Sequence, residues 1–468
     1  MDKAVASPAA AVEDIVDGST IGIAGFGVAH RFPSSLITAL HKMGVTGLTV
    51  YCNGLGQPGH PTAHLLADGG QIAHLVTCFS ARPGVVSAAE RAIGSGQMTL
   101  EMVPQGTLVE RMRAGGAGLA AFYTPVSVGT TIADGKDVRY FDGAPYVLER
   151  AITTDFALVR AYRADRMGNL QFRGGSRNFN VCFAKAARVA IAEVDEIVEV
   201  GELSPDEIDL PGVFVGRVVR SELQMDVQNL PMRPSRPAES AREYLGKPAL
   251  TRGEVARRTA RLLPDGAVVN LGAGLPNLVS NYIGDRPVVL HSENGILNYG
   301  PIISGPDFDP DVHDASGYFV QLRPGAAFFE SVTSFEIARS GRLDAVILGA
   351  YQVSADGDLA NWATPGMVGG GIGGAMDLAV GARRVIVMLE HTDSQGRPKL
   401  VERCDFPLTA PSCVNTVVTD LALLHREPES GRFRLDEIAR GFTVDDVLSL
   451  TGMPVTVADP VGVMQDNW

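Results

Sequence analysis

Two segments of this chain align with each other without a gap, and this self-similarity limits the folds that the chain can adopt. Asp155–Leu170 has the sequence DFALVRAYRADRMGNL, and Asp344–Leu359 has the sequence DAVILGAYQVSADGDL. Asp, Ala, Tyr, Gly and Leu coincide in the two segments. Strands of alternating α/β proteins resemble one another by chance, so this pair alone does not demonstrate a duplication.

Two further pairs of segments occur in the same order along the chain. Asp17–Phe26 and Asp265–Gly274 are each a turn, an apolar strand and a glycine turn, followed by a proline. The runs AARVAIAEV and ARRVIVMLE, which begin at Ala186 and Ala382, are apolar and contain β-branched residues. Three pairs in one order indicate a duplication. We therefore expect two homologous domains in tandem, with an interface where ligand sites are common.

Apolar stretches such as LTVYC, PVVLHS and VIVMLE alternate with segments of helical length. This alternation predicts three-layer α/β domains with mostly parallel sheets that are covered on both faces. A chain of 468 residues is too long for a single core, so two or three domains are expected. The polar, proline-rich segment at 222–242 is interpreted as a linker between domains at 1–221 and 243–468.

The composition argues against several functional classes. A net charge of −13 disfavours a nucleic-acid partner. No apolar run approaches the ~20 residues that a membrane span needs, and no export signal is visible. The five cysteines form no CxxC pair and the nine histidines no HExxH motif, so neither a metal site nor a disulfide framework is expected. We expect a reduced, cytoplasmic protein.

A glutamate stands at the end of the apolar strand Pro287–Leu290, in the stretch LHSENG. Glu293 leaves this strand at a tight turn, because Asn294 and Gly295 are turn formers. Chemistry in open α/β sheets gathers at the carboxyl ends of strands, which makes Glu293 a candidate catalytic acid. Strand-end acids are also common in loops without a catalytic role, and the pattern alone leaves both interpretations open.

Backbone N–H groups and one glutamine are further candidates. The glycine-rich segment Gly369–Gly374 precedes a helix start and can form an anion-binding nest or an oxyanion hole. Its letters satisfy GxGxxG, but it follows a loop and not a strand, so we reject a nicotinamide site. Gln105 is flanked by Pro104 and Gly106, and it can hydrogen-bond a substrate or lie in a solvated turn.

Ordered motifs extend along nearly the whole chain. The first half contains AGFG near Phe26, PQGTLVERMRAGGAG, FYTP and RNFN. The second half contains NLGAGLP, SENGIL, RPGAAFF, GDLANW, GGAMDLAV, EHTD and CDFPLT. This set resembles the class I CoA-transferases, most closely the succinyl-CoA:3-oxoacid CoA-transferase group with its two subunit types fused into one chain.

The resemblance implies that Glu293 attacks an acyl-CoA and carries a glutamyl-CoA thioester. The exchange is then of the ping-pong type, between a donor such as succinyl-CoA and a carboxylic acid such as a 3-oxoacid. The resemblance also implies oxyanion donors at the backbone N–H groups of Gly373 and Gly374 and near Leu271, and a substrate contact at Gln105. It implies no metal and no separate cofactor, since CoA is itself a substrate. We expect a homodimer.

Departures from the family's pattern cluster where the acid or the pantetheine arm should lie. Arg31 replaces the last glycine of the first glycine motif, Asn53 stands where an asparagine pair is usual, and Asn298 follows SENG where small residues are usual. With Phe26, these three residues are candidate substrate contacts. Arg31 can pair with a second carboxylate on a dicarboxylic acid, so the acceptor acid stays open.

Two other functions on the same scaffold stay open. An acyl-CoA hydrolase would let water reach the glutamyl intermediate and would release CoA without an acceptor acid. A non-catalytic relative that only binds CoA esters would need no nucleophile, and the intact SENG stretch disfavours it.

Overall fold

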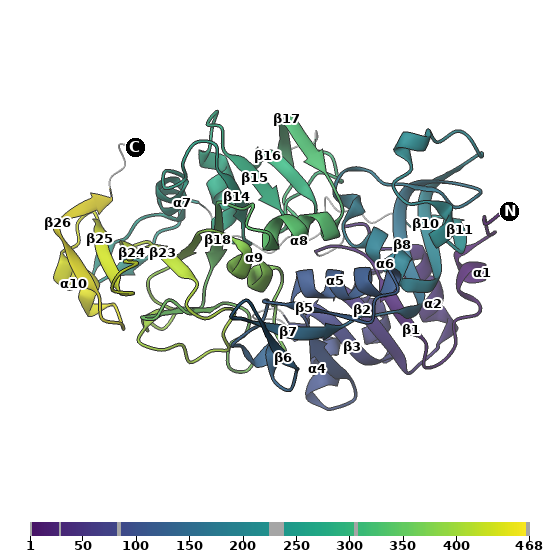
Figure 1. The fold of residues 1–468 in the computed structure, drawn as a ribbon, viewed down its shortest axis with the longest axis horizontal. Helices are drawn as coiled ribbons and strands as arrows, with labels where there is room; N and C mark the ends of the chain where they lie inside the picture. Colours follow the sequence, from purple (N-terminus) through teal and green to yellow (C-terminus); the bar gives the residue numbers. More distant parts are fainter. Residues whose placement is uncertain (1, 28–29, 82–85, 224–237, 304–307, 465–468) are drawn as a thin grey trace.

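The computed structural model describes residues 2–27, 30–81, 86–223, 238–303 and 308–464. The chain forms two α/β halves that lie side by side in Figure 1, the first coloured purple to blue-green and the second teal to yellow. One half is built on an eight-stranded sheet and the other on a ten-stranded sheet. Two tandem α/β domains with mostly parallel sheets were expected, and the structure confirms this fold class.

The first sheet has the strand order β11-β10-β8-β1-β2-β3-β4, and neighbours on this path run parallel. Its strands are rich in Val, Leu and Ile because helices and loops cover both faces. A short antiparallel strand, β9, pairs with β8. The bounds are β1 Thr20–Ile23, β2 Leu48–Gly54, β3 Ile72–Phe79, β4 Thr99–Met102, β8 Thr154–Asp165, β9 Leu170–Gln171, β10 Ala187–Val198 and β11 Arg217–Arg220.

The second sheet has the order β17-β16-β15-β14-β18-β21-β23-β24-β25-β26. In this order the strands from β15 to β23 run parallel, antiparallel pairs extend the sheet on both sides, and β26 at one edge pairs parallel with β25. The bounds are β14 Val268–Leu271, β15 Val289–Ser292, β16 Ile296–Ile302, β17 Val320–Phe328, β18 Ala345–Gly349, β21 Val385–Leu389, β23 Val414–Thr419, β24 Ala422–Arg426, β25 Phe433–Ala439 and β26 Thr456–Met464.

The topology repeats between the two halves in the way that the aligned segments predict. The order β2-β1-β8-β10 in the first sheet matches β15-β14-β18-β21 in the second, and each aligned pair of segments contributes matching strands. Asp155 and Asp344, which open the gapless alignment, even make the same hydrogen bond. Asp155 accepts from the N–H of Thr20 at 3.0 Å and Asp344 from the N–H of Val268 at 2.9 Å, in each case the first residue of the central strand.

Local capping signals set the ends of several helices. At the start of α7 the Thr251 hydroxyl accepts the N–H of Glu254 at 3.2 Å, and the Glu254 carboxylate accepts the N–H of Thr251 at 2.6 Å. The helices are α1 Pro8–Val12, α2 Ser34–Met43, α3 His64–Asp68, α4 Ala88–Gly94, α5 Gln105–Gly116, α6 Asn180–Ala186, α7 Arg252–Ala260, α8 Ser331–Arg339, α9 Ala375–Gly381 and α10 Val444–Ser449. Within the described ranges, no helix has both the length and the apolar character that a membrane crossing requires.

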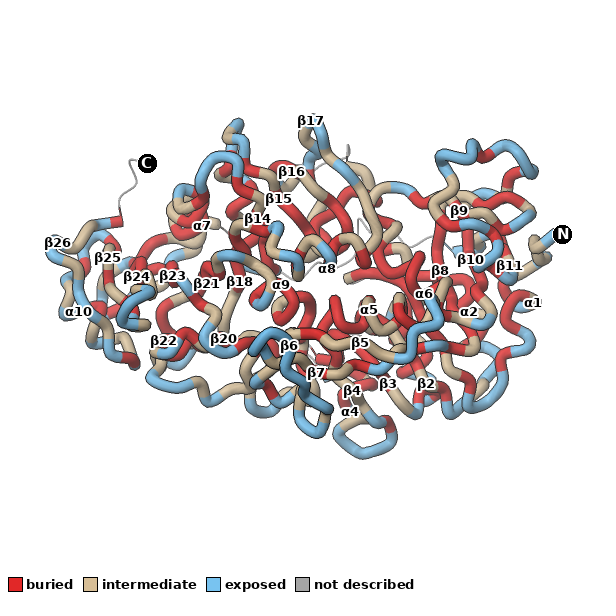
Figure 2. Tube along the Cα trace, viewed as in Figure 1, coloured by how far each residue is buried: buried red, intermediate tan, exposed pale blue. Residues whose placement is uncertain are grey.

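Helices α5, α8 and α9 form the centre of the contact between the halves. Leu108 and Met112 of α5 are fully buried in the same apolar cluster as Phe335 of α8. Arg339 of α8 donates to the carbonyl oxygen of Gly106 at 3.2 Å, which ties the start of α5 to the second half. Figure 2 shows buried segments running through the middle of the molecule, where these helices meet. The interface therefore belongs to one continuous core.

Three small sheets and a connecting segment complete the chain. The sheets are β5-β7-β6 (Ala121–Thr124, Ala144–Arg150, Val138–Phe141), β12-β13 (Glu243–Tyr244, Lys247–Pro248) and β20-β19-β22 (Leu359–Ala360, Gln352–Ser354, Leu400–Val401). Most of the predicted linker, residues 224–237, lies outside the described residues. The domain boundaries at 221 and 243 therefore stay predictions.

Candidate active site

The stretch LHSENG forms the tight turn that its residues predict. Ser292 and Ile296 pair as antiparallel neighbours, so only Glu293, Asn294 and Gly295 connect β15 to β16. The N–H of Gly295 donates to the carbonyl oxygen of Ser292 at 3.0 Å, and Gly295 has a φ of +101°. Glu293 is thus the first residue beyond the carboxyl end of β15, the place where this class of sheet presents its reactive groups.

The Glu293 carboxylate lies in a desolvated position with one neutral donor nearby. The Nδ2 group of Asn270, on the adjacent strand β14, lies 3.5 Å from its Oε2 atom. Burial raises the pKa of Glu293, its own backbone N–H and the amide of Asn270 oppose this rise, and the charge of Asp377 adds to it. Part of the residue's surface stays accessible, while the carboxylate itself is desolvated. A desolvated carboxylate keeps more of its nucleophilicity than one in bulk water.

Asn270 is oriented from behind by a buried histidine. Its Nδ2 atom lies 3.0 Å from Nδ1 of His291, whose Nε2 atom lies 3.0 Å from the Ser334 hydroxyl. Burial lowers the pKa of His291 to about 4, so its imidazole is neutral near pH 7. A neutral ring with the proton on Nε2 accepts from Asn270 and donates to Ser334. This arrangement holds the amide with its N–H groups toward Glu293.

Gln105 and Asn53 come from the first half and meet the glycine-rich segment of the second. The Nε2 atom of Gln105 donates to Oδ1 of Asn53 at 2.7 Å, and its backbone N–H donates to the carbonyl of Gly373 at 2.9 Å. Gln105 is fully buried at the start of α5, and its Oε1 atom has no hydrogen-bond partner. The next N–H, of Gly106, donates to Asp377 at 3.0 Å. Gln105 is therefore not in a solvated turn, and an orphan acceptor of this kind suits a ligand that carries a donor.

The glycine-rich segment owes its composition to close packing between the halves. The N–H of Ser80, just beyond β3, donates to the carbonyl oxygen of Gly370 at 2.9 Å. A Cβ atom on Gly369 would lie 2.0 Å from the Ser80 hydroxyl oxygen, and one on Gly373 would lie 2.8 Å from the Phe79 ring. Side chains at these positions would separate the two backbones.

One of the predicted oxyanion donors already has a backbone partner, and another lies inside a strand. The N–H of Gly373 donates to the carbonyl oxygen of Cys78 at 3.4 Å. Leu271 is the last residue of β14 and pairs with Ile347 in the sheet. Gly374 caps the start of α9, and a Cβ atom there would lie 3.2 Å from Oε1 of Gln105. Of the three positions, Gly374 fits the predicted oxyanion role best.

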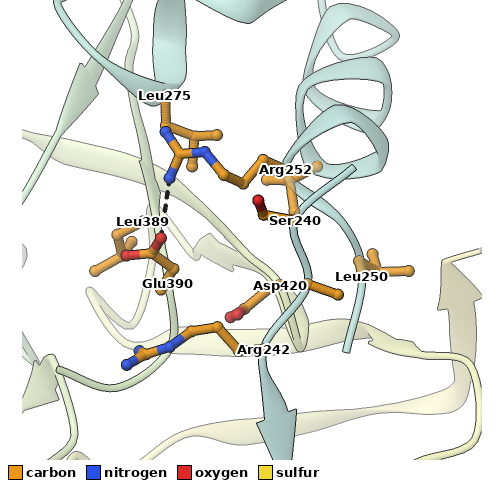
Figure 3. A pocket seen from close by; sticks show the side chains of 10 residues that line it. Ser240, Arg242, Leu250, Arg252, Leu275, Leu389, Glu390 and Asp420 are labelled. Atoms are coloured by element: carbon orange, nitrogen blue, oxygen red, sulfur yellow. Dashed lines mark hydrogen bonds and ion pairs between the residues drawn. The ribbon is translucent and has the colours of Figure 1, made fainter. Parts of the chain in front are cut away.

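A small cavity elsewhere in the second half is too small to hold a substrate (Figure 3). Its volume of about 20 Å³ accommodates about one water molecule. An ion pair between Arg252 and Glu390, at 2.9 Å, crosses it, and Arg242 and Asp420 lie beside it. Neither Glu293 nor Gln105 lines this cavity. The cavity therefore does not define the reactive centre.

A family described as Coenzyme A transferase matches residues 5–221 and 253–450 of this chain. The two matched segments contain Gln105 and Glu293, respectively. The chain belongs to the coenzyme A transferase family. It is a CoA-transferase whose two halves each match the family once, in agreement with the duplication.

Relatives of this CoA-transferase cover either the whole chain or one half of it. The human mitochondrial succinyl-CoA:3-ketoacid coenzyme A transferase 2 is 39% identical, over 99% of this chain and 92% of the relative. One subunit of the Xanthomonas campestris succinyl-CoA:3-ketoacid enzyme is 48% identical, over 46% of this chain and 88% of the relative. One subunit of the Pseudomonas putida 3-oxoadipate CoA-transferase is 47% identical, over 44% of this chain and 96% of the relative. One chain here thus spans what two subunits provide elsewhere.

A solved structure shares the fold of this CoA-transferase. The acyl-CoA transferase YdiF from Escherichia coli O157:H7, in a thioester complex with CoA, superposes with a TM-score of 0.79. The match covers 99% of this chain and 95% of that chain at 20% sequence identity. At this identity the likeness establishes the fold.

Three predicted substrate contacts of this CoA-transferase lie in other surroundings. Arg31 makes ion pairs with Asp195 and Asp311, so its guanidinium group is occupied by protein carboxylates. Phe26 is buried, with its ring stacked 6.1 Å from that of Phe179. Asn298 has a φ of +61° and donates to the carbonyl oxygen of Pro324 at 2.8 Å, within the β16–β17 hairpin. The predicted pairing of Arg31 with a substrate carboxylate does not fit this geometry.

Two polar residues near Glu293 were missed by the sequence interpretation. Asn270 interrupts the apolar run VVNLG in a central strand, where a buried amide is costly without a purpose. Asp377, in GGAMDLAV, is fully buried, and burial raises its pKa to about 6. A polar residue inside a strand or helix with an otherwise apolar pattern was the available signal in both cases.

Proposed function

We propose that this CoA-transferase exchanges CoA between a short acyl-CoA, such as succinyl-CoA, and a 3-oxo acid, with Glu293 as the nucleophile. The observation that carries the proposal is the desolvated Glu293 carboxylate at the carboxyl end of β15, next to the neutral donor of Asn270 and at the interface between the halves. The mammalian and Xanthomonas relatives, which are named for succinyl-CoA and 3-keto acids, support this choice of substrates.

The proposed exchange proceeds by acyl transfer through Glu293. Its carboxylate oxygen attacks the thioester carbonyl, the carbon–sulfur bond breaks, and CoA leaves as a thiolate. The acyl group is then joined to Glu293 as a mixed anhydride. The thiolate then attacks the glutamyl carbonyl and releases the donor acid, which leaves CoA on Glu293 as a thioester. The acceptor carboxylate reverses both steps. No proton or electron is consumed, so the exchange needs no metal and no further cofactor.

Gln105 and Asn53 are proposed to line the substrate site, and Gly374 to donate to the oxyanion. The full burial of Gln105 at the start of α5 and its bond to Asn53 support the first assignment. Asn270 is proposed to orient Glu293 before attack. Removing a single oxyanion donor typically lowers kcat by about 10²–10³.

Trapping of the thioester tests the nucleophile. The intact mass of the protein is measured after incubation with succinyl-CoA, and again after borohydride reduction of any thioester. We expect the mass of one CoA adduct per chain, its loss on reduction, and no adduct in Glu293→Gln. Glu330→Gln serves as a matched control because burial also raises the pKa of that glutamate, near the end of β17. An adduct that persists in Glu293→Gln would assign the nucleophile elsewhere.

The acceptor acid is tested with a panel of 3-oxo acids. We expect a higher kcat/KM with acetoacetate than with 3-oxoadipate, because Arg31 is already paired with two carboxylates and does not offer a site for a second substrate carboxylate. The likeness of 44% of the chain to one subunit of a 3-oxoadipate enzyme makes that acid the informative competitor. CoA release without any acid would instead indicate a hydrolase.

We also propose a cytoplasmic homodimer. The five cysteines, all within the described residues, are unpaired, which suits a reducing compartment. The mammalian relatives are named as mitochondrial, so cell fractionation is the appropriate test of location. Light scattering on the purified protein tests the dimer.

A further inference from the structure

We propose that Arg31 is a positioning residue that clamps the two halves together and, through Asn294, holds the turn that presents Glu293. This inference rests on the proposed nucleophilic role of Glu293. It goes beyond that role by assigning a task to an arginine where the family has a glycine.

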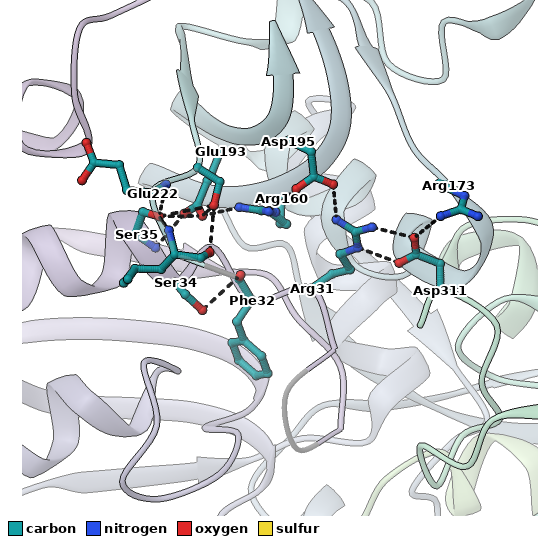
Figure 4. A network of polar contacts seen from close by, with 12 residues as sticks. Arg31, Phe32, Ser34, Ser35, Arg160, Arg173, Glu193, Asp195, Glu222 and Asp311 are labelled. Atoms are coloured by element: carbon teal, nitrogen blue, oxygen red, sulfur yellow. Dashed lines mark hydrogen bonds and ion pairs between the residues drawn. The ribbon is translucent and has the colours of Figure 1, made fainter. Parts of the chain in front are cut away.

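The clamp is a two-pronged ion pair between residues far apart in the chain. Nε and Nη2 of Arg31 donate to the two carboxylate oxygens of Asp311 at 2.6 and 2.5 Å (Figure 4). The Asp311 side chain is 1% exposed, and that of Arg31 is 17% exposed. Bidentate, mostly buried pairs of this kind restrict both partners in distance and in orientation.

Arg31 is itself anchored in the first half. Its Nη1 atom donates to Asp195 at 2.7 Å, and the other carboxylate oxygen of Asp195 accepts from Arg160. Arg160 also donates to Glu193, whose carboxylate accepts the backbone N–H of Ser35 at 2.9 Å, at the start of α2. Figure 4 shows this chain of contacts leading from α2 to Arg31. The guanidinium group that binds Asp311 is therefore also held by β10, through Asp195, and indirectly by α2.

The partner loop of the second half is held against the first half at further points. The backbone N–H of Gly175 donates to the carbonyl oxygen of Asp311 at 2.8 Å. Arg173 makes an ion pair with Asp309 at 2.6 Å. The ring of His313 stacks on that of His30, with 3.7 Å between centroids. Asp309, Asp311 and His313, which lie between β16 and β17, thus all pack against the first half.

Asn294 connects the clamped loop to the nucleophile. Its Nδ2 atom donates to the carbonyl oxygen of His313 at 2.7 Å, and the side chain is fully buried. Asn294 is adjacent to Glu293 inside a turn of only three residues, so a shift of the loop is passed to the glutamate. Truncation of Arg31 leaves Asp311 buried, and among the described residues Arg173, at 3.7 Å, is then the cation paired with it. The loop would then move to rehydrate that carboxylate.

Rapid-mixing measurement of thioester formation separates positioning from a merely structural role. The burst amplitude counts active sites, whereas the rate constant reports how each site works. In Arg31→Ala we expect the rate constant to fall about 10–100-fold with every acyl-CoA donor, because a misplacement of about 1 Å costs up to about 10²-fold. The amplitude per folded chain and the KM for the acceptor acid should stay close to wild type. Arg31→Lys, which keeps the charge, should recover part of the rate.

A double-mutant cycle tests the route through Asn294. If both residues act on the same turn, Arg31→Ala with Asn294→Ala should be little slower than the slower single variant. Arg258→Ala is the matched control, since Arg258 forms a similar bidentate pair with Glu437 at 2.8 and 2.7 Å between α7 and β25. It should lower the urea midpoint and leave the rate constant unchanged.

Three results would overturn the clamp. These are an unchanged rate constant in Arg31→Ala, a raised KM for one acid with an unchanged rate constant, and independent, multiplying effects of the two substitutions. If the wild-type protein forms no thioester, the proposed function itself is overturned. This outcome is separate from the three above, because it is seen in the wild-type protein and they are seen in variants. Should Arg31→Ala fail to fold, Arg31→Lys and Asn294→Ala supply the same cycle.

Discussion

Glu293 is a charged residue in a position that disfavours charge. Burial and the nearby Asp377 both raise its pKa, and its own backbone N–H and the amide of Asn270 oppose this rise. The cost has a chemical use, because a weakly solvated carboxylate attacks a thioester more readily than a hydrated one. The raised pKa also makes the rate depend on pH, since only the ionised form of Glu293 attacks.

The acid limb of the rate profile should therefore move when Asp377 loses its charge. A raised pKa means that the ionised form of Glu293 is lost at a higher pH than for an ordinary glutamate. Asp377, with a pKa of about 6, adds to this rise while it is ionised. In Asp377→Asn the rate of thioester formation should persist to lower pH, as measured by rapid mixing between pH 5 and pH 8.

Asp265→Asn is the control for this shift, because Asp265 lies in the turn before β14, at the opposite end of the strand from Glu293, and is 64% exposed. It should leave the limb in place. Asp314, whose pKa burial raises to about 7, also interacts with Glu293 and contributes to the width of the limb. A limb that moves to higher pH in Asp377→Asn would contradict the assignment of Glu293 as the titrating group.

The duplicated elements of the two halves carry different chemistry at matching positions. Thr20 pairs with Thr49 on β2, and Val268 pairs with Val289 on β15. Asn53 lies four residues after Thr49, and Glu293 lies four residues after Val289, so the two residues occupy matching positions. One copy of the element thus ends in the proposed substrate amide and the other in the proposed nucleophile. Asn53 is linked to the second half through Gln105, whose backbone N–H donates to the carbonyl oxygen of Gly373.

The β15–β16 turn should tolerate no side chain at Gly295. A Cβ atom there would lie 1.8 Å from the Phe329 carbonyl oxygen, in addition to the strain of a φ of +101°. Gly295→Ala should therefore lower the free energy of unfolding by about 2–4 kcal/mol, measured by urea denaturation, and slow thioester formation.

Gly341→Ala controls for the dihedral angle alone, because Gly341 has a φ of +73° and open space around its Cβ position. It should cost about 1–2 kcal/mol, and equal losses in both variants would show that the close approach contributes nothing.

At the scale of the whole molecule, the two halves form one working unit. The cluster that contains Leu108 of α5 and Phe335 of α8 is a shared core, and Asp377 and Gly106 bond across it. Relatives that are named as single subunits of two-subunit enzymes align with one half or the other. We therefore expect association of the halves and activity to depend on the interface more than on the covalent link.

A chain divided between residues 230 and 231 tests this expectation. The two pieces, produced together with a tag on one, should copurify and show transferase activity of the same order as the intact protein. Phe335→Asp in the second piece places a charge in the fully buried contact and should prevent copurification. Independent purification of well-folded, unassociated pieces would contradict a shared core.

The sequence by itself determined the features that depend on local pattern. Periodicity and the three repeated segments predicted α/β domains and their duplication, since strand and turn signals lie within a few residues of one another. The turn residues after Ser292 predicted where Glu293 would stand, and the ordered motifs indicated the family. Each of these inferences needs only neighbours in the chain or the order of segments.

Tertiary structure alone decided the partners of residues that lie far apart in sequence. From the sequence, Arg31 was expected to be free to bind a substrate carboxylate. The fold instead places Asp195 and Asp311 against it. The glycines of Gly369–Gly374 suggested an anion nest, but the fold packs Ser80 and Phe79 onto them. Burial sets the pKa of Glu293, and the ion pairs between the halves set its orientation. Both depend on which surfaces meet in space, and no local pattern encodes that.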